Sequence, residues 1–125
     1  MTRDLNLLRG IMLFLEEQPA ATAVHSHQLQ ERFPDFDEMV IADHVLQLKE
    51  ENLIEGTVLI YPKEKMSKIR IERITNQGHD FIKALGDESV WKKVTKEVID
   101  QGKAFSIGLI VQYAQAKAKE SLGLS

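Results

Sequence analysis

The sequence contains no cysteine and no long hydrophobic run. Without cysteine the chain forms no disulfide, offers no thiolate to a metal and has no cysteine nucleophile, so it suits a reducing compartment. The longest uncharged apolar run, residues 105–116, is interrupted by polar residues and is shorter than the about 20 residues that a membrane-spanning helix needs. Residues 1–10 are charged and lack the apolar core of a signal peptide. We therefore expect a cytoplasmic protein that does not enter a membrane.

Catalytic motifs are absent as well. The sequence has no Gly-rich phosphate loop, nucleophile elbow, metalloprotease helix or dinucleotide fingerprint. His25 and His27 would point alike only in a strand, and no third metal ligand is evident. His44 lies at the edge of a helical core stripe and is interpreted as a packed, hydrogen-bonded side chain, while His79 has no nucleophile or cleft to serve. We expect no enzyme activity, no metal site and no cofactor.

The charge is unevenly distributed along the 125 residues, although the net charge is only −3. Residues 1–62 hold four Lys or Arg against eleven Asp or Glu, a balance of −7. Residues 63–125 hold twelve against eight, a balance of +4. The acidic half contains the predicted third helix, and the basic half begins with the predicted wing. Because the local potential decides what a surface attracts, this asymmetry matters more than the net charge.

The chain is organised around residues 34–73, which predict a helix followed directly by a hairpin. Asp35 with Glu38 three residues later resembles a capping box, and no Gly or Pro interrupts the helix that follows. Residues 53–74 then alternate apolar and polar positions on both sides of a turn-rich segment at 62–67. Two short, tightly connected helices come before this unit. We predict a mainly α fold with a small β-hairpin, a winged helix-turn-helix with additional C-terminal helices.

The domain organisation follows from the remaining elements. A first helix is expected to begin at Thr2 or Asp4, and residues 21–25 are a candidate small strand before the second helix. We assign residues 1–86 to the winged-helix domain. We assign residues 87–125, with two further helices, to a helical extension packed on it.

The predicted third helix has a core stripe and an outward stripe. On a helical wheel, Ile41, Val45, Leu48 and Asn52 form the core stripe. The outward stripe joins an apolar end to acidic residues, which suits a protein partner with a basic rim. It consists of Phe36, Met39, Val40, Asp43, Gln47 and Glu50. The alternative is that the C-terminal helices or another copy of the chain cover it.

A winged helix raises the hypothesis that the third helix enters the major groove of DNA while the wing touches phosphate. Residues 35–51 contain six acidic residues and one basic residue, which is the wrong sign for a polyanion. The wing is the better candidate for contact with double-stranded DNA, because its basic residues outnumber Glu64 and Glu72. These are Lys63, Lys65, Lys68, Arg70 and Arg73. The alternative is a solvated hairpin edge that lysine protects from aggregation.

The last predicted helix is a candidate homodimer surface. It combines an aliphatic stripe with small residues, and the stripe includes Ile107, Ile110, Val111 and Ala114. The alternative is that this helix folds back onto the first helix as part of the core.

Several segments together resemble a known family. They are Arg3-Asp4-Leu5 with Leu8-Arg9 and Ile11, His44-Val45 and Leu48 before Leu53-Ile54-Glu55, Arg73-Ile74-Thr75 before Gly78-His79-Asp80-Phe81, and Trp91 with Lys93. The chain is similar to a domain-of-unknown-function family of small bacterial proteins, often prophage-borne, whose known members are winged helices followed by extra C-terminal helices.

The resemblance covers nearly the whole chain and implies a fold and a phage-associated setting, but it carries over no functional residue. Asn52 stands where many members have Gly, a position that suits a left-handed backbone. The resulting hypothesis is a non-catalytic, phage-related winged-helix protein that binds DNA or regulates transcription. The alternative is a protein-interaction adaptor whose acidic third helix has lost groove binding.

Overall fold

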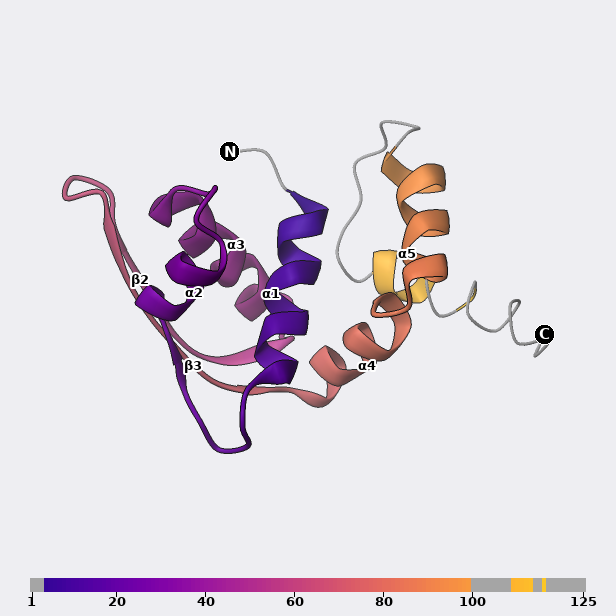
Figure 1. Ribbon diagram of the computed structural model, residues 1–125, viewed down its shortest axis with the longest axis horizontal. Coiled ribbons are helices and arrows are strands. Elements are labelled where there is room, and N and C mark those ends of the chain that lie inside the picture. The colour runs from indigo at the N-terminus through magenta and orange to yellow at the C-terminus, as the bar shows by residue number, and fades with distance from the viewer. Residues whose placement is uncertain (1–3, 100–108, 114–115, 117–125) are drawn as a thin grey trace. The chain divides into compact units, whose positions relative to one another are not determined.

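The computed structural model describes residues 4–99, 109–113 and 116. The chain divides into two compact units, Met1–Gly78 and His79–Ser125. It is mainly helical, as expected, with a small antiparallel sheet in the first unit (Figure 1). In the described part of the chain no helix combines the length and the apolar character needed to cross a membrane.

Three helices build the core of the first unit: α1 (Leu5–Glu17), α2 (Ser26–Arg32) and α3 (Glu38–Glu50). The carboxylate of Asp4 accepts the backbone N–H of Leu7 at 3.1 Å and so begins α1 at one of its two expected caps. The apolar sides of the helices face inward, and burial of each large side chain stabilises the fold by about 1.5–3 kcal/mol. The fully or almost fully buried apolar side chains include Leu8, Ile11, Met12, Leu29, Ile41, Val45 and Leu48.

The sheet has three strands in the order β1-β3-β2. They are β1 (Val24–His25), β2 (Ile54–Tyr61) and β3 (Met66–Ile74), and both pairings are antiparallel. The candidate strand at residues 21–25 is therefore confirmed, although only its last two residues pair. In Figure 1 the tip of the β2–β3 hairpin extends beyond α2 and α3.

Strand β1 is short because the chain turns into α2 at Ser26, whose hydroxyl takes the next hydrogen-bonding position beside β3. Val24 lies opposite Ile71 and His25 opposite Arg70. At the next position the chain has already turned into α2, and the Ser26 hydroxyl accepts the backbone N–H of Ile69 at 2.7 Å. The Ser26 side-chain oxygen thus replaces a backbone carbonyl as the acceptor for β3. This hydrogen bond fixes the start of α2 to β3.

The predicted capping box of α3 is wrong. The helix begins at Glu38 with Asp37 as its N-cap, because residues 33–36 form a turn in which the Phe36 N–H donates to the Phe33 carbonyl at 3.2 Å. The Glu38 carboxylate instead accepts the backbone N–H and the hydroxyl of Ser67 at 2.9 and 3.1 Å. One acidic side chain of the helix is thus used to hold β3.

The expected core stripe of α3 is correct for Ile41, Val45 and Leu48 and wrong for Asn52. The helix has ended at Glu50, so the wheel does not extend to residue 52. Asn52 is exposed and has a φ of 63°, the left-handed conformation that the comparison with Gly indicated.

The second unit contains most of α4 (Asn76–Leu85), all of α5 (Glu88–Val94) and a π-helical turn (Thr95–Ile99). The carboxylate of Asp87 accepts the backbone N–H groups of Ser89 and Val90 at 2.8 and 3.1 Å and so caps the start of α5. The buried apolar side chains of the second unit include Phe81, Leu85, Val90, Trp91 and Val94.

Candidate functional site

The outward face of the sheet gathers polar, basic and apolar side chains. The alternation of β2 and β3 buries one side of each strand and exposes the other. Cross-strand pairing places Thr57 opposite Arg70, Leu59 opposite Lys68 and Tyr61 opposite Met66. We call this surface the outward sheet face; its members are Thr57, Leu59, Tyr61, Met66, Lys68 and Arg70, joined by His25 from β1.

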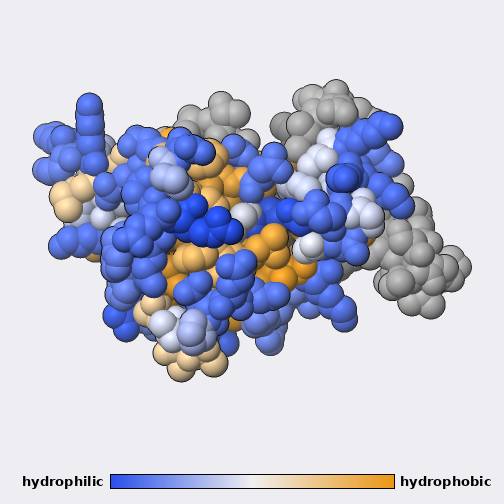
Figure 2. All heavy atoms as spheres, viewed as in Figure 1, coloured by the Kyte–Doolittle hydropathy of each residue, from blue (hydrophilic) through white to orange (hydrophobic). Residues whose placement is uncertain are grey.

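Large apolar side chains are exposed on this face. The exposed fractions are 45% for Leu59, 37% for Tyr61 and 39% for Met66. They lie toward the tip of the hairpin, whose surface in Figure 2 is otherwise largely hydrophilic. Apolar contact area is thus placed directly beside the basic residues.

The tip of the hairpin carries two of the five predicted DNA contacts. Residues 62–65 form a turn closed by the Lys65 N–H, which donates to the Pro62 carbonyl at 3.2 Å. Lys65 has a φ of 51°, a left-handed conformation common at such turns. Lys63 and Lys65 are both exposed.

The two predicted arginines are already paired with carboxylates. Arg70 Nε lies 3.1 Å from Glu72 Oε1. Arg73 binds Glu55 through two hydrogen bonds of 2.6 and 3.0 Å. The hydrogen bond from Arg73 lowers the pKa of the Glu55 carboxyl and raises the pKa of Arg73.

The lysines differ from the arginines in this respect. Among the described carboxylates, none lies within ion-pair distance of Lys63, Lys65 or Lys68. The positive charge that the β2–β3 hairpin offers to an external anion therefore comes first from these three lysines.

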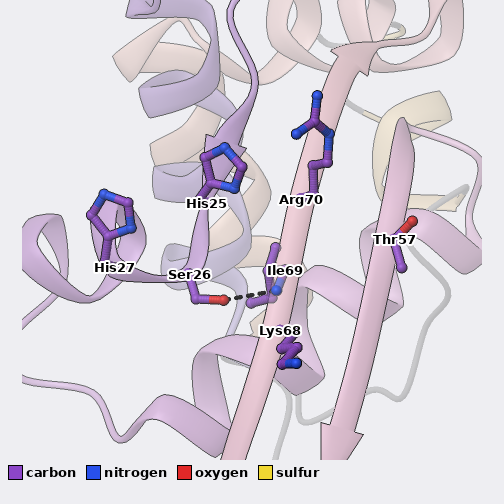
Figure 3. A pocket seen from close by; sticks show the side chains of 7 residues that line it. All are labelled: His25, Ser26, His27, Thr57, Lys68, Ile69 and Arg70. Carbon is purple, nitrogen blue, oxygen red and sulfur yellow. Dashed lines mark hydrogen bonds between the residues drawn. The ribbon is translucent and has the colours of Figure 1, made fainter.

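An open pocket of about 530 Å³ lies on the outward sheet face where β1 meets β3. Its walls come from β1, the start of α2, β2 and β3 (Figure 3). The imidazoles of His25 and His27 are nearly parallel, with an angle of 9° and centroids 6.1 Å apart. The lining residues are His25, Ser26, His27, Thr57, Lys68, Ile69 and Arg70.

The predicted protein-partner stripe of α3 is only partly open. Glu50 is exposed, while Phe36, Met39, Val40, Asp43 and Gln47 are half-buried. The Gln47 amide donates to the Asp43 carboxylate at 2.9 Å. The stripe keeps its acidic character, because Asp43 and Glu50 reach the surface and Lys49 is its only basic neighbour within α3.

The predicted dimer helix falls largely outside the described residues. Ile110 is buried and Val111 is half-buried, whereas Ile107 and Ala114 lie outside the part of the chain that the structure describes. Within the described residues no group of three or more His, Asp or Glu side chains is arranged to hold a metal ion.

A family model described as "Hypothetical protein (DUF2513)" matches residues 2–104. The chain belongs to this family. No curated protein and no solved structure shows significant similarity to the chain. Membership of DUF2513 identifies relatives without assigning them an activity.

One segment of the family resemblance, residues 78–81, has a structural explanation. A β-carbon on Gly78 would lie 2.1 Å from the Leu53 carbonyl oxygen, so this contact requires glycine. The Thr75 hydroxyl donates to the Asn52 carbonyl at 2.6 Å and accepts the Gly78 N–H at 3.0 Å. Phe81 is buried, and His79 and Asp80 are exposed. Gly78, the last residue of the first unit, thus lies against the end of the α3–β2 connection.

Sequence reasoning missed the pocket because it considered His25 and His27 only as neighbours in the sequence. The residue opposite His25 is Arg70, 45 positions away, and only the register of β1 with β3 brings the two together. A signal was present in the candidate strand at residues 21–25, but its partner strand was not assigned.

Proposed function

We propose that residues 1–78 of this DUF2513 protein form a winged helix-turn-helix domain, and that the protein is a non-catalytic, phage-related regulator that binds double-stranded DNA through its β2–β3 hairpin. The order of elements supports the domain: a helix, a short strand, two helices and a hairpin, with the short strand paired to the second strand of the hairpin. In such domains the hairpin forms the wing.

The observation that carries the proposal is the separation of charge between α3 and the hairpin. Asp43 and Glu50 reach the surface of α3, and both would repel phosphate if this helix lay in the major groove. Lys63, Lys65 and Lys68 instead share the hairpin with no described carboxylate paired to them. DNA is therefore bound by contacts to its backbone from the wing, with little direct reading of bases.

The expected strength follows from the number of unpaired cations. Each phosphate neutralised on a duplex contributes about −0.9 to the slope of log K against log salt, so three lysines give a slope of about −3. Binding is correspondingly weak at physiological salt and independent of sequence.

The test is a titration of the protein with a fluorescent random-sequence duplex at low salt, repeated as the salt is raised. The combined change Lys63→Gln, Lys65→Gln and Lys68→Gln is expected to abolish binding. The control has the same loss of charge elsewhere and consists of Lys83→Gln, Lys92→Gln and Lys96→Gln, three exposed lysines of the second unit. Absence of binding by the wild type at low salt, or equal loss in both variants, would remove the proposal.

A second candidate function is a protein-interaction adaptor that uses the outward stripe of α3. The half-buried Phe36, Met39 and Val40 beside exposed acidic charge favour it. A cross-linking pull-down is expected to lose its partners after Asp43→Lys with Glu50→Lys and to keep them after the triple lysine change of the wing. The opposite result would count against the adaptor.

A further inference from the structure

The pocket between β1 and β3 has an unusual set of lining groups. Two imidazoles, an ammonium and a guanidinium surround it, and a hydroxyl from Thr57 completes the polar lining. None of its lining residues carries a carboxylate. All of the ionisable groups are donors or become cations on protonation, which is the lining expected for an oxyanion.

The walls of the pocket are held in position by the backbone. Cross-strand pairing places His25 opposite Arg70, and Arg70 in turn lies opposite Thr57. The hydrogen bond from Ile69 N–H to the Ser26 hydroxyl, 2.7 Å long, fixes the start of α2 against β3 (Figure 3). His27 follows in the first turn of α2, and its ring stays parallel to that of His25.

The charged groups around the pocket are unequal in availability. Lys68 has no described ion-pair partner, whereas Arg70 is held by Glu72 at 3.1 Å. A second acidic residue, Glu31, follows His27 by one helical turn on α2 and therefore lies near the His27 ring. An arriving anion thus meets Lys68 first and competes with Glu72 for Arg70.

We infer that this pocket binds an oxyanion of the phosphate class, and that its affinity rises on protonation of His25 and His27. Histidine is the side chain that changes charge between about pH 5 and 8, and the imidazolium form donates from both ring nitrogens. The oxyanion is supplied by a phosphodiester of bound DNA, in which case the inference rests on the function proposed above, or by a free phosphomonoester. Because the pocket is open, both sources have room to enter.

The test is an amide NMR titration of the full chain with sodium sulfate, with chloride used to keep the ionic strength constant. Sulfate has the shape of phosphate and keeps its charge over the range in which histidine titrates, so a change of affinity with pH reports on the protein. The amides of His25, His27, Lys68 and Arg70 are expected to shift together, with severalfold tighter binding at about pH 6 than at about pH 8.

Substitutions locate the site. His27→Gln and Lys68→Gln, both at exposed positions, are each expected to weaken sulfate binding about five- to tenfold. Glu72→Gln is expected to strengthen it by releasing Arg70. His79→Gln and Lys83→Gln, exposed residues outside the pocket, are the matched controls, and dispersed amide spectra verify that each variant is folded. Absence of a sulfate-dependent shift at about pH 6, or equal binding by the pocket and control variants, would overturn the inference.

Two further titrations distinguish the sources of the oxyanion. Duplex DNA that shifts the amides of Lys63 and Lys65 but leaves the pocket amides unchanged would exclude DNA as the source of the oxyanion and leave the proposed function standing. Sulfate and a nucleoside monophosphate that bind in the pocket, with no binding of duplex, would support the pocket as a site for a phosphorylated small molecule and remove DNA binding. Shifts of the pocket amides by the duplex support both.

Discussion

Gly78 lies directly against the backbone of Leu53, so close that a β-carbon at residue 78 would be 2.1 Å from the Leu53 carbonyl oxygen and 2.6 Å from the Ile74 Cγ2 atom. A carbonyl group cannot move aside as a flexible side chain can. The contact therefore fixes the distance between the start of α4 and the segment that follows α3.

Gly78→Ala is expected to destabilise the protein by about 2–4 kcal/mol in urea unfolding. Helix propensity alone would predict the opposite effect, a stabilisation by about 1 kcal/mol, because Ala is favoured over Gly inside a helix. Gly10→Ala in α1 is the control, because its new β-carbon meets only the Phe33 ring, at 3.2 Å. That variant is expected to stay within about 1 kcal/mol of the wild type. Equal stability of the two variants would contradict the Gly78 contact.

His44 is expected to be a structural residue whose removal is costly. Its side chain is fully buried. The Nδ1–H donates to the Val40 carbonyl at 2.7 Å, and Nε2 accepts the Asp4 N–H at 2.9 Å. His44→Ala removes both side-chain hydrogen bonds and leaves a cavity, and it is expected to lower the free energy of unfolding by about 2–4 kcal/mol.

The exposed His79 provides the comparison for His44. His79→Ala is expected to change the free energy of unfolding by no more than about 0.5 kcal/mol. The sequence predicted a packed, hydrogen-bonded His44, and the buried ring with its two partners confirms this. A small effect of His44→Ala in the same urea titration would contradict it.

The start of α3 can be tested by comparing Asp35 with Glu38. A capping box would make both residues important, whereas in the structure Glu38 binds Ser67 and Asp35 is exposed outside the helix. Glu38→Ala and Ser67→Ala are expected to show a coupling energy of about 1–2 kcal/mol in a double-mutant cycle. Asp35→Ala is expected to change stability by at most about 0.5 kcal/mol. A larger effect at Asp35 than at Glu38 would favour the capping box.

How far the sequence predicts the fold depends on how local each signal is. The hairpin was predictable because alternation is visible within the eight or nine residues of β2 and β3. The partner of β1 was not, because two residues show no period. The five basic residues of the hairpin were predicted as a set, but their pairing was not, since the neighbours of Arg70 and Arg73 depend on register and rotamer.

The same distinction applies to residues with special backbone conformations. Asn52 gave a local signal, because Asn and Gly share the left-handed region, and its φ of 63° agrees. Gly78 is a glycine for a non-local reason, since its conflict is with Leu53. Contacts between residues that are distant in the sequence can be located only on the folded backbone. For the same reason the pocket on the outward sheet face could not be predicted from the sequence.

The stability of α5 is expected to depend on pH through Asp87. Hydrogen bonds from the Ser89 hydroxyl and from the N–H groups of Val90 and Ser89 lower the pKa of this carboxyl below its ordinary value of 3.8. A group with a depressed pKa in the folded state stabilises the fold fully above its unfolded value, and this stabilisation is lost as the pH falls through the folded value. Asp87→Ala is therefore expected to lower Tm by a constant amount from neutral pH down to about pH 5, and the difference from wild type should shrink below about pH 4. Glu88→Ala, the neighbouring exposed acidic residue, serves as the control in the same series of thermal melts. A difference between wild type and Asp87→Ala that persists unchanged into strong acid would mean that the ionised cap does not stabilise α5.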